Sequence, residues 1–243
     1  MIDINCDMGE INTLLDNGTY EALMDHVTSI NIACGGHAGD EKMIRAMVET
    51  AKEKKVKIGA HPSYPDRKNF GRYEMTISDE DLSTSILEQI TRVMNIATEY
   101  NYSISHMKPH GALYNKAAND ESLATLIGEV IISINPSLPI MCLAGSRMVS
   151  ILEDMGLNVL RESFADRTYE ADGNLRKRTL SNALIVDSKI ASMQAYNISK
   201  YNKLVTYDGT EITIQSETVC IHSDTPDALK IAIAVNSKLN RSQ

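Results

Sequence analysis

The sequence predicts an α/β barrel, and three observations lead to this fold class. Short apolar segments alternate with amphipathic segments of helical periodicity from the N-terminus onward, which is typical of βα units around a parallel sheet. The chain has 243 residues, close to the roughly 250 of a barrel that forms one domain. Hydrophobic residues make up 43% of the chain and aromatic residues only 5%, so the core must be large and aliphatic.

Seven segments have the apolar and β-branched composition of strands. Each is four to six residues long, which suits strands buried on both faces of a parallel sheet. In chain order they are residues 2–5, 28–33, 56–60, 103–108, 139–143, 158–161 and 218–221.

The intervening segments carry helix signals. Over residues 40–55 apolar side chains recur with helical spacing, with acids at the start and lysines at the end, as the helix dipole favours. Residues 78–90 begin with a helix cap, and a further helix is expected over 120–134 before Asn135-Pro136. Proline in the first turn indicates that residues 225–227 open the last helix.

One segment, at about residues 168–217, interrupts this alternation. It contains a helix-like run over 188–198 and then Asp208-Gly209 between two β-rich runs, which is a strong hairpin signal. We expect a single barrel domain over residues 1–243, with this segment as a hairpin-containing excursion before the last strand.

Charge and composition narrow the classes of partner. The net charge of −8 argues against nucleic acid and against anionic membranes, although a few local cations can still hold a small anionic substrate. No apolar run of about 18 residues and no signal peptide are found, so we expect a cytoplasmic protein. The four isolated cysteines are then expected to be reduced thiols. The oligomeric state stays open and includes a homo-oligomer.

Four of the six histidines lie just past the end of a predicted strand. Ligands bind at the carboxyl ends of strands in a parallel barrel, and histidine transfers protons near neutral pH. One such histidine is more often a structural hydrogen-bonding group, but four on four strands favour an active site. They are His37, His61, His110 and His222.

Other residues at the strand ends have structural alternatives. Lys108 ends an apolar strand, where an unpaired ammonium group is costly, so a functional role is favoured. Asp7 and Asp224 either belong to the site or cap helices. His26 and His106 are expected to be structural.

Several familiar sequence motifs are absent. There is no GxxxxGK[ST] loop for ATP, no GxGxxG after a strand, no GxSxG elbow and no HExxH. The sequence therefore indicates no ATP site of its own. Scattered His and Asp residues can still bind a metal, but no local spacing demands one, and none is assigned.

Five segments, in the same order and spanning nearly the whole chain, resemble the LamB/YcsF family, whose members are known as the A subunit of 5-oxoprolinase. The segments are NCDMGE (5–10), NIACGGHAGD (31–40), GAHPSYPD (59–66), KPHGALY (108–114) and FADR (164–167). One departure is Ser223, where the family usually has glycine between His222 and Asp224. A serine there is unfavourable if the position needs a positive φ.

The resemblance implies an irregular, seven-stranded parallel (β/α) barrel related to glycoside hydrolases and deacetylases. It also implies opening of the lactam ring of 5-oxo-L-proline to L-glutamate, with ATP hydrolysis supplied through the partner subunits B and C. Since the chain shows no ATP motif, activation of the lactam by phosphoryl transfer is expected to take place elsewhere.

Roles follow from the resemblance as hypotheses. Lys108 and Arg167 would hold a substrate carboxylate or a phosphorylated oxygen. His61 or His110, oriented by Asp7 or Asp166, would activate water, and the other histidine would protonate the leaving nitrogen. The predicted catalytic residues are Asp7, His37, His61, Lys108, His110 and Asp166, and the predicted substrate-binding residues are Asn31, Arg72, Tyr114, Glu162, Arg167, His222 and Asp224.

Two alternatives remain open at this point. One is a metal-dependent amidohydrolase or deacetylase with His37, His61, Asp7 and His222 as ligands, which stoichiometric zinc would favour. The other is a non-catalytic lactam-binding barrel, which would bind 5-oxoproline but form no glutamate.

Overall fold

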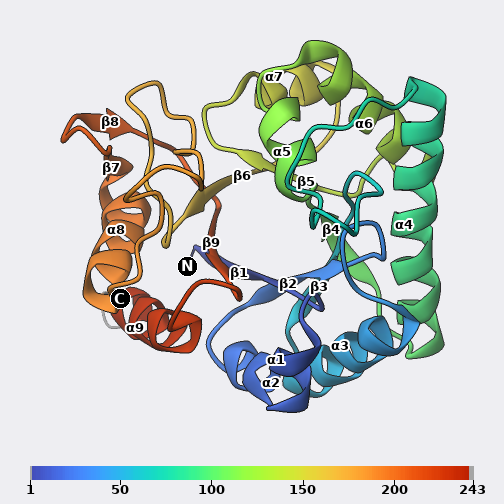
Figure 1. Cartoon of the computed structure of the whole chain (residues 1–243), viewed down its shortest axis with the longest axis horizontal. Helices are drawn as coiled ribbons and strands as arrows, with labels where there is room; N and C mark the ends of the chain where they lie inside the picture. The colour runs from blue at the N-terminus through green and yellow to red at the C-terminus, as the bar shows by residue number, and fades with distance from the viewer. Residues whose placement is uncertain (1, 241–243) are drawn as a thin grey trace.

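A closed barrel of seven parallel strands forms the centre of the molecule in the computed structural model, which describes residues 2–240 (Figure 1). All seven predicted strands are present, with ends shifted by at most three residues. Around the barrel the order is β1-β2-β3-β4-β5-β6-β9. The bounds are β1 (Asp3–Met8), β2 (Ser29–Ala33), β3 (Lys57–His61), β4 (Ile104–Met107), β5 (Ile140–Leu143), β6 (Val159–Phe164) and β9 (Thr218–His222).

The barrel is irregular on one side. The register between β3 and β4 shifts between Ile58 and Gly59. Strands β4 and β5 share a single register pair, Met107 with Ile140. The expected irregular seven-stranded barrel is therefore confirmed.

Helices surround the barrel, and side-chain caps fix several of their starts. The predicted cap of α4 is confirmed by the Ser78 hydroxyl, which accepts a backbone N–H three residues on. The Asp120 carboxylate caps α6 in the same way. The short helices α1, α2, α5 and α7 were not predicted. The bounds are α1 (Asn12–Asp16), α2 (Thr19–Met24), α3 (Glu41–Lys54), α4 (Asp79–Glu99), α5 (Gly111–Ala117), α6 (Glu121–Ile134), α7 (Arg147–Asp154), α8 (Ser188–Tyr201) and α9 (Ala228–Asn240).

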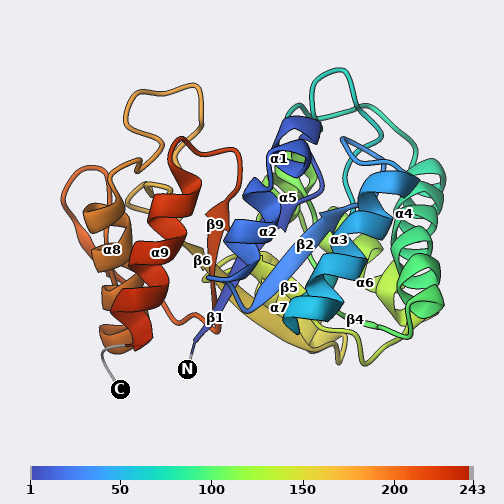
Figure 2. The same cartoon turned by 90° about the horizontal axis from the view of Figure 1, so that it is seen from below.

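The segment between β6 and β9 lies outside the barrel sheet. It contains α8 and the predicted hairpin, in which β7 (Lys203–Val205) pairs with β8 (Glu211–Thr213) around Asp208-Gly209. Helix α8 packs beside α9, at the left of Figure 1. Parts of the two long connections 62–78 and 165–187 rise above the same end of the barrel in Figure 2.

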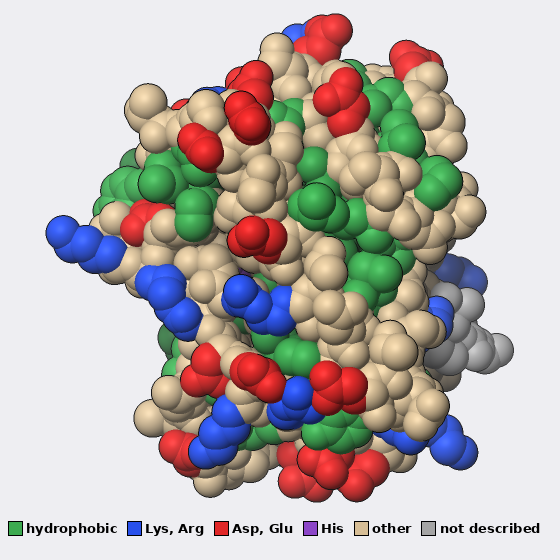
Figure 3. Space-filling view, turned by 90° about the vertical axis from the view of Figure 1, so that its right-hand side faces the viewer, with side chains coloured by type: hydrophobic (Ala, Val, Ile, Leu, Met, Phe, Trp, Pro, Cys, Tyr) green, Lys and Arg blue, Asp and Glu red, His purple; other side chains and the backbone are tan. Residues whose placement is uncertain are grey.

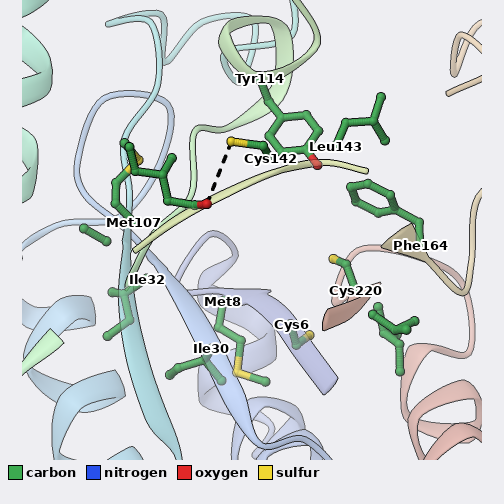
Figure 4. Packing of buried hydrophobic residues seen from close by; sticks show 14 of the residues in the cluster. Cys6, Met8, Ile30, Ile32, Met107, Tyr114, Cys142, Leu143, Phe164 and Cys220 are labelled. Carbon is green, nitrogen blue, oxygen red and sulfur yellow. Dashed lines mark hydrogen bonds between the residues drawn. The ribbon is translucent and has the colours of Figure 1, made fainter. Parts of the chain in front are cut away.

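Alternation along β1 shows how the barrel separates apolar from polar side chains. Ile4, Cys6 and Met8 belong to the buried hydrophobic cluster between strands and helices, part of which is drawn in Figure 4. Asn5 and Asp7 lie between them in sequence and point to the opposite face, because successive side chains alternate along a strand. The interior of this barrel is therefore polar, while the aliphatic core surrounds it.

Within residues 2–240 no helix is both long and apolar enough to cross a bilayer. Acidic and basic side chains are interspersed over the face that includes α4 (Figure 3). All four cysteines are buried and free.

Candidate active site

The carboxyl ends of the strands bring the predicted histidines to one end of the barrel. His61 is the last residue of β3, His222 is the last residue of β9, and Lys108 and His110 follow β4. His37 lies in the turn after β2. These five side chains are far apart in sequence, and only closure of the barrel places them together.

A buried ion-pair cluster occupies the barrel interior. The Lys108 ammonium lies 2.9 Å from Asp7 Oδ1, 2.8 Å from Glu162 Oε1 and 3.2 Å from Cys220 Sγ. Burial opposes the charged form of Lys108, but the negative charges of Asp7 and its neighbours prevail and hold its pKa well above the usual value. Burial likewise opposes ionisation of Asp7, yet the charge of Lys108 keeps its pKa well below the usual value.

Amide side chains hold these carboxylates from below. Asn31 Nδ2 donates to Asp7 Oδ1 at 2.7 Å, and Asn5 Nδ2 donates to Glu162 Oε1 at 2.9 Å. His106 Nε2 lies 2.7 Å from Asn31 Oδ1. Asn31 and Glu162, both predicted to bind substrate, are thus part of the buried support of Asp7 and Lys108.

Three imidazole rings lie above Asp7, and backbone carbonyls fix two of them. His61 Nδ1 donates to the Lys108 carbonyl at 2.7 Å, and His110 Nε2 donates to the Phe70 carbonyl at 3.0 Å. The remaining nitrogens, His61 Nε2 and His110 Nδ1, lie 3.0 Å apart. The His37 ring stacks on His110 with centroids 3.6 Å apart.

Glu10 completes this group and was missed as a site residue. Its Oε1 lies 3.0 Å from His37 Nε2, 3.3 Å from His110 Nδ1 and 3.9 Å from His61 Nε2. Despite burial, the neighbouring His110 and His37 hold the Glu10 pKa well below its usual range. Burial lowers the pKa of His37 to about 3, and burial also lowers that of His110. The sequence signal was an acid directly after a strand-end glycine, Gly9.

Two sets of side chains have the donor types of a metal site. In the first, ligand atoms of Glu10, His37, His61 and His110 all lie within 4.8 Å of one another. In the second, the same holds for Asp7, Cys220 and His222. The four ligands expected from sequence are therefore divided between two sets, with Glu10, His110 and Cys220 as additions.

Asp166 orients His222 beside this group. The Asp166 carboxylate accepts hydrogen bonds from His222 Nδ1 at 3.0 Å and from Thr225 Oγ1 at 2.6 Å. Burial would raise the pKa of Asp166, but the charge of His222 and these hydrogen bonds lower it to about 2. Ser223, which follows His222, has no positive φ, so its replacement of glycine introduces no left-handed strain.

Arginines mark the rim. Arg72 and Arg178 both pair with Asp224, the latter at 3.2 Å, and Arg178 was not predicted. Arg167 is buried and does not lie at the rim; it donates Nε to the Ala183 carbonyl at 3.3 Å and a second N–H to the Arg176 carbonyl.

Tyr114 lies deeper, beside the ion-pair cluster. Its ring meets Phe164 edge-on with centroids 5.9 Å apart (Figure 4), and the Lys108 ammonium lies 6.0 Å from its ring centroid. Tyr114 is buried, so it lines the floor of the site rather than its rim.

The arrangement suits proton transfer. Two imidazoles with adjacent inner nitrogens lie beside an ionised carboxylate, since His61 Nε2 is 3.5 Å from Asp7 Oδ2. A base that accepts a proton from water and an acid that delivers one to a leaving group can therefore act within one pocket. The roles assigned to individual residues stay predictions.

Comparisons with known proteins agree with this geometry. The sequence model of the LamB/YcsF family matches residues 2–243. The A subunit of 5-oxoprolinase from Chloroflexus aggregans is 41% identical over 98% of this chain and 94% of its own length, and that of Halalkalibacterium halodurans is 39% identical over 98% and 93%. The crystal structure of the lactam utilization protein from Thermus thermophilus superposes with a TM-score of 0.92 at 34% identity, covering 99% of this chain and 96% of that one. The chain belongs to the LamB/YcsF family.

Proposed function

We propose that this chain is the A subunit of an ATP-dependent 5-oxoprolinase and that it opens the lactam ring of 5-oxo-L-proline to give L-glutamate. Its relatives are named as the A subunit of 5-oxoprolinase, and a solved relative is named a lactam utilization protein. In this proposal the chain is cytoplasmic and works with subunits B and C, through which ATP hydrolysis is supplied.

The observation that carries the proposal is the pair of histidines beside Asp7. Opening a lactam forms a bond from water oxygen to the carbonyl carbon and breaks the bond from that carbon to nitrogen. One proton must leave the water and one must reach the nitrogen. His61 and His110, with inner nitrogens 3.0 Å apart, supply both transfers at one point in space.

The charged groups then divide into two tasks. Lys108 is already bridged to Asp7 and Glu162, so we assign it to keeping Asp7 ionised beside His61. Arg72 and Arg178 lie at the rim and share Asp224, so we assign them to the carboxylate of the substrate. The substrate carboxylate would supply part of the negative charge that Asp224 now offers to these arginines. Guanidinium groups bind carboxylates with good geometry.

Reconstitution tests the proposal. The chain is mixed with subunits B and C, 5-oxoproline and ATP, and glutamate is measured, with the chain omitted as control. We expect glutamate only in the complete mixture, and loss of about 10² or more in rate for His61→Ala and for His110→Ala. Near-full activity of both variants would remove the histidine assignment. Tight 5-oxoproline binding without any glutamate from the unaltered chain would overturn the enzymatic function.

A further inference from the structure

The inner ring nitrogens, His61 Nε2 and His110 Nδ1, face each other in an electrostatically unfavourable arrangement that a cation between them would stabilise. A carbonyl oxygen only accepts hydrogen bonds, so the contacts to the Lys108 and Phe70 carbonyls place hydrogens on His61 Nδ1 and His110 Nε2. In the neutral rings His61 Nε2 and His110 Nδ1 then carry lone pairs, and these face each other at 3.0 Å. The carboxylate of Glu10 adds a further oxygen at the same point, 3.3 Å from His110 Nδ1.

The separations match those of a tetrahedral metal site. Zinc binds imidazole nitrogen and carboxylate oxygen at about 2.0–2.1 Å, which places neighbouring ligands about 3.3 Å apart in a tetrahedron. Here Glu10 Oε1 lies 3.3 Å from His110 Nδ1 and 3.9 Å from His61 Nε2. These values, with the 3.0 Å between the two histidines, bracket the tetrahedral spacing.

The surroundings hold the ligands as metal sites require. Ligating histidines donate their outer N–H to a carbonyl or carboxylate, and both His61 and His110 do so. The loop that follows β3 packs closely against the His37 and His110 side chains. A Cβ on Gly71 in this loop would lie 3.0 Å from His37 Cβ and 3.1 Å from His110 Cδ2. The Phe70 ring meets His37 and His110 edge-on and adds an apolar shell.

We propose that Glu10, His61 and His110 bind one divalent transition metal of the zinc class, with a fourth position open to water. The His37 ring lies parallel to that of His110, so it cannot direct a lone pair at the same ion, and it holds Glu10 instead. An imidazole-rich set with one carboxylate suits such metals, whereas magnesium and calcium favour all-oxygen sites. Metal binding itself does not depend on the function proposed above. Its use in that reaction does: with the ion bound, the inner nitrogens of His61 and His110 would be ligands rather than proton carriers, and the ion would act as a Lewis acid that activates water beside Asp7.

The experiment uses the full chain, stripped with a chelator, dialysed and titrated with zinc or with magnesium in calorimetry. We expect one zinc per chain, no comparable magnesium binding, and a rise in melting temperature with zinc. Glu10→Gln and His110→Ala should weaken zinc binding at least about 10²-fold, because even loss of an outer partner costs 10–100-fold. Cobalt in place of zinc should give the visible absorption of a four-coordinate ion and lose it in Glu10→Gln.

Control variants locate the site. His26→Ala removes a histidine that precedes β2, at the other end of the strands, and should leave zinc binding unchanged. His222→Ala removes a member of the second potential ligand set, and this variant should also still bind zinc. Circular dichroism checks that each variant is folded, and Glu10→Gln is nearly isosteric, so at least one ligand variant should fold.

Three results would overturn the inference. The first is the absence of stoichiometric zinc from the unaltered chain, which would leave a shared proton as the cation between the histidines. The second is zinc binding that persists in both ligand variants. The third is zinc binding that is lost only in His222→Ala. Zinc binding without glutamate in the reconstituted mixture would count against the proposed function and not against the site. Glutamate formation by a chain that binds no zinc would do the reverse.

Discussion

Replacement of Lys108 by methionine tests whether the ion-pair cluster determines the stability of the barrel interior. Lys108→Met keeps the length of the side chain and removes its charge, so Asp7 and Glu162 lose the ammonium group that lies 2.9 and 2.8 Å away. The side chains of these residues are 3%, 5% and 0% exposed, so water cannot replace the lost partner. Removing one member of a buried pair costs about 3–5 kcal/mol, and we expect a loss of that size in the free energy of unfolding.

The assay is urea denaturation at pH 7, followed by circular dichroism. Lys116→Met is the matched control, because Lys116 pairs with the exposed Glu74 at 3.4 Å and an exposed pair contributes about 1 kcal/mol or less. Adding Glu162→Gln to Lys108→Met should restore part of the loss, since one of two uncompensated charges is then removed.

The pH dependence has a defined sign. The pKa of Asp7 is lowered in the folded protein, so its stabilising contribution is present above about pH 4 and is lost as the pH falls. The difference between the unaltered chain and Lys108→Met should therefore shrink below about pH 4. A loss under about 1 kcal/mol at pH 7, equal to the Lys116→Met control, would refute the reasoning.

Three further changes have expected outcomes. Asp166, beside His222, has a pKa of about 2. Its lowered pKa should contribute about 2 kcal/mol to the free energy of unfolding, present above about pH 4 and lost toward pH 2. Asp166→Asn should therefore make the free energy of unfolding less dependent on pH in that window. Gly59→Ala places a Cβ 2.2 Å from His106 Nε2; the displaced ring should lower the unfolding free energy by about 1–3 kcal/mol in urea, and an unchanged midpoint would contradict this contact. Asp120→Ala removes the cap of α6; calorimetry should show a loss of about 1 kcal/mol with the fold retained.

Local sequence patterns were sufficient for most of the secondary structure. Strand composition located all seven barrel strands, because buried parallel strands are short, continuous apolar runs. The cap residue Ser78 located the start of α4, since a side-chain oxygen there satisfies a backbone N–H at the helix end that has no partner within the helix. The short helices α1, α2, α5 and α7 were missed because one or two turns carry too little periodicity.

The sequence by itself placed chemically active side chains at strand ends, because that order is local and can be counted along the chain. It did not show that Glu10 joins His37, His61 and His110, nor that Asn31 and Glu162 lie beneath Asp7 and Lys108. Those contacts join residues from 24 to more than 100 positions apart, and a difference of one angström decides between a hydrogen bond and no contact. Only closure of the barrel sets such distances, so tertiary structure decided which carboxylate meets which histidine.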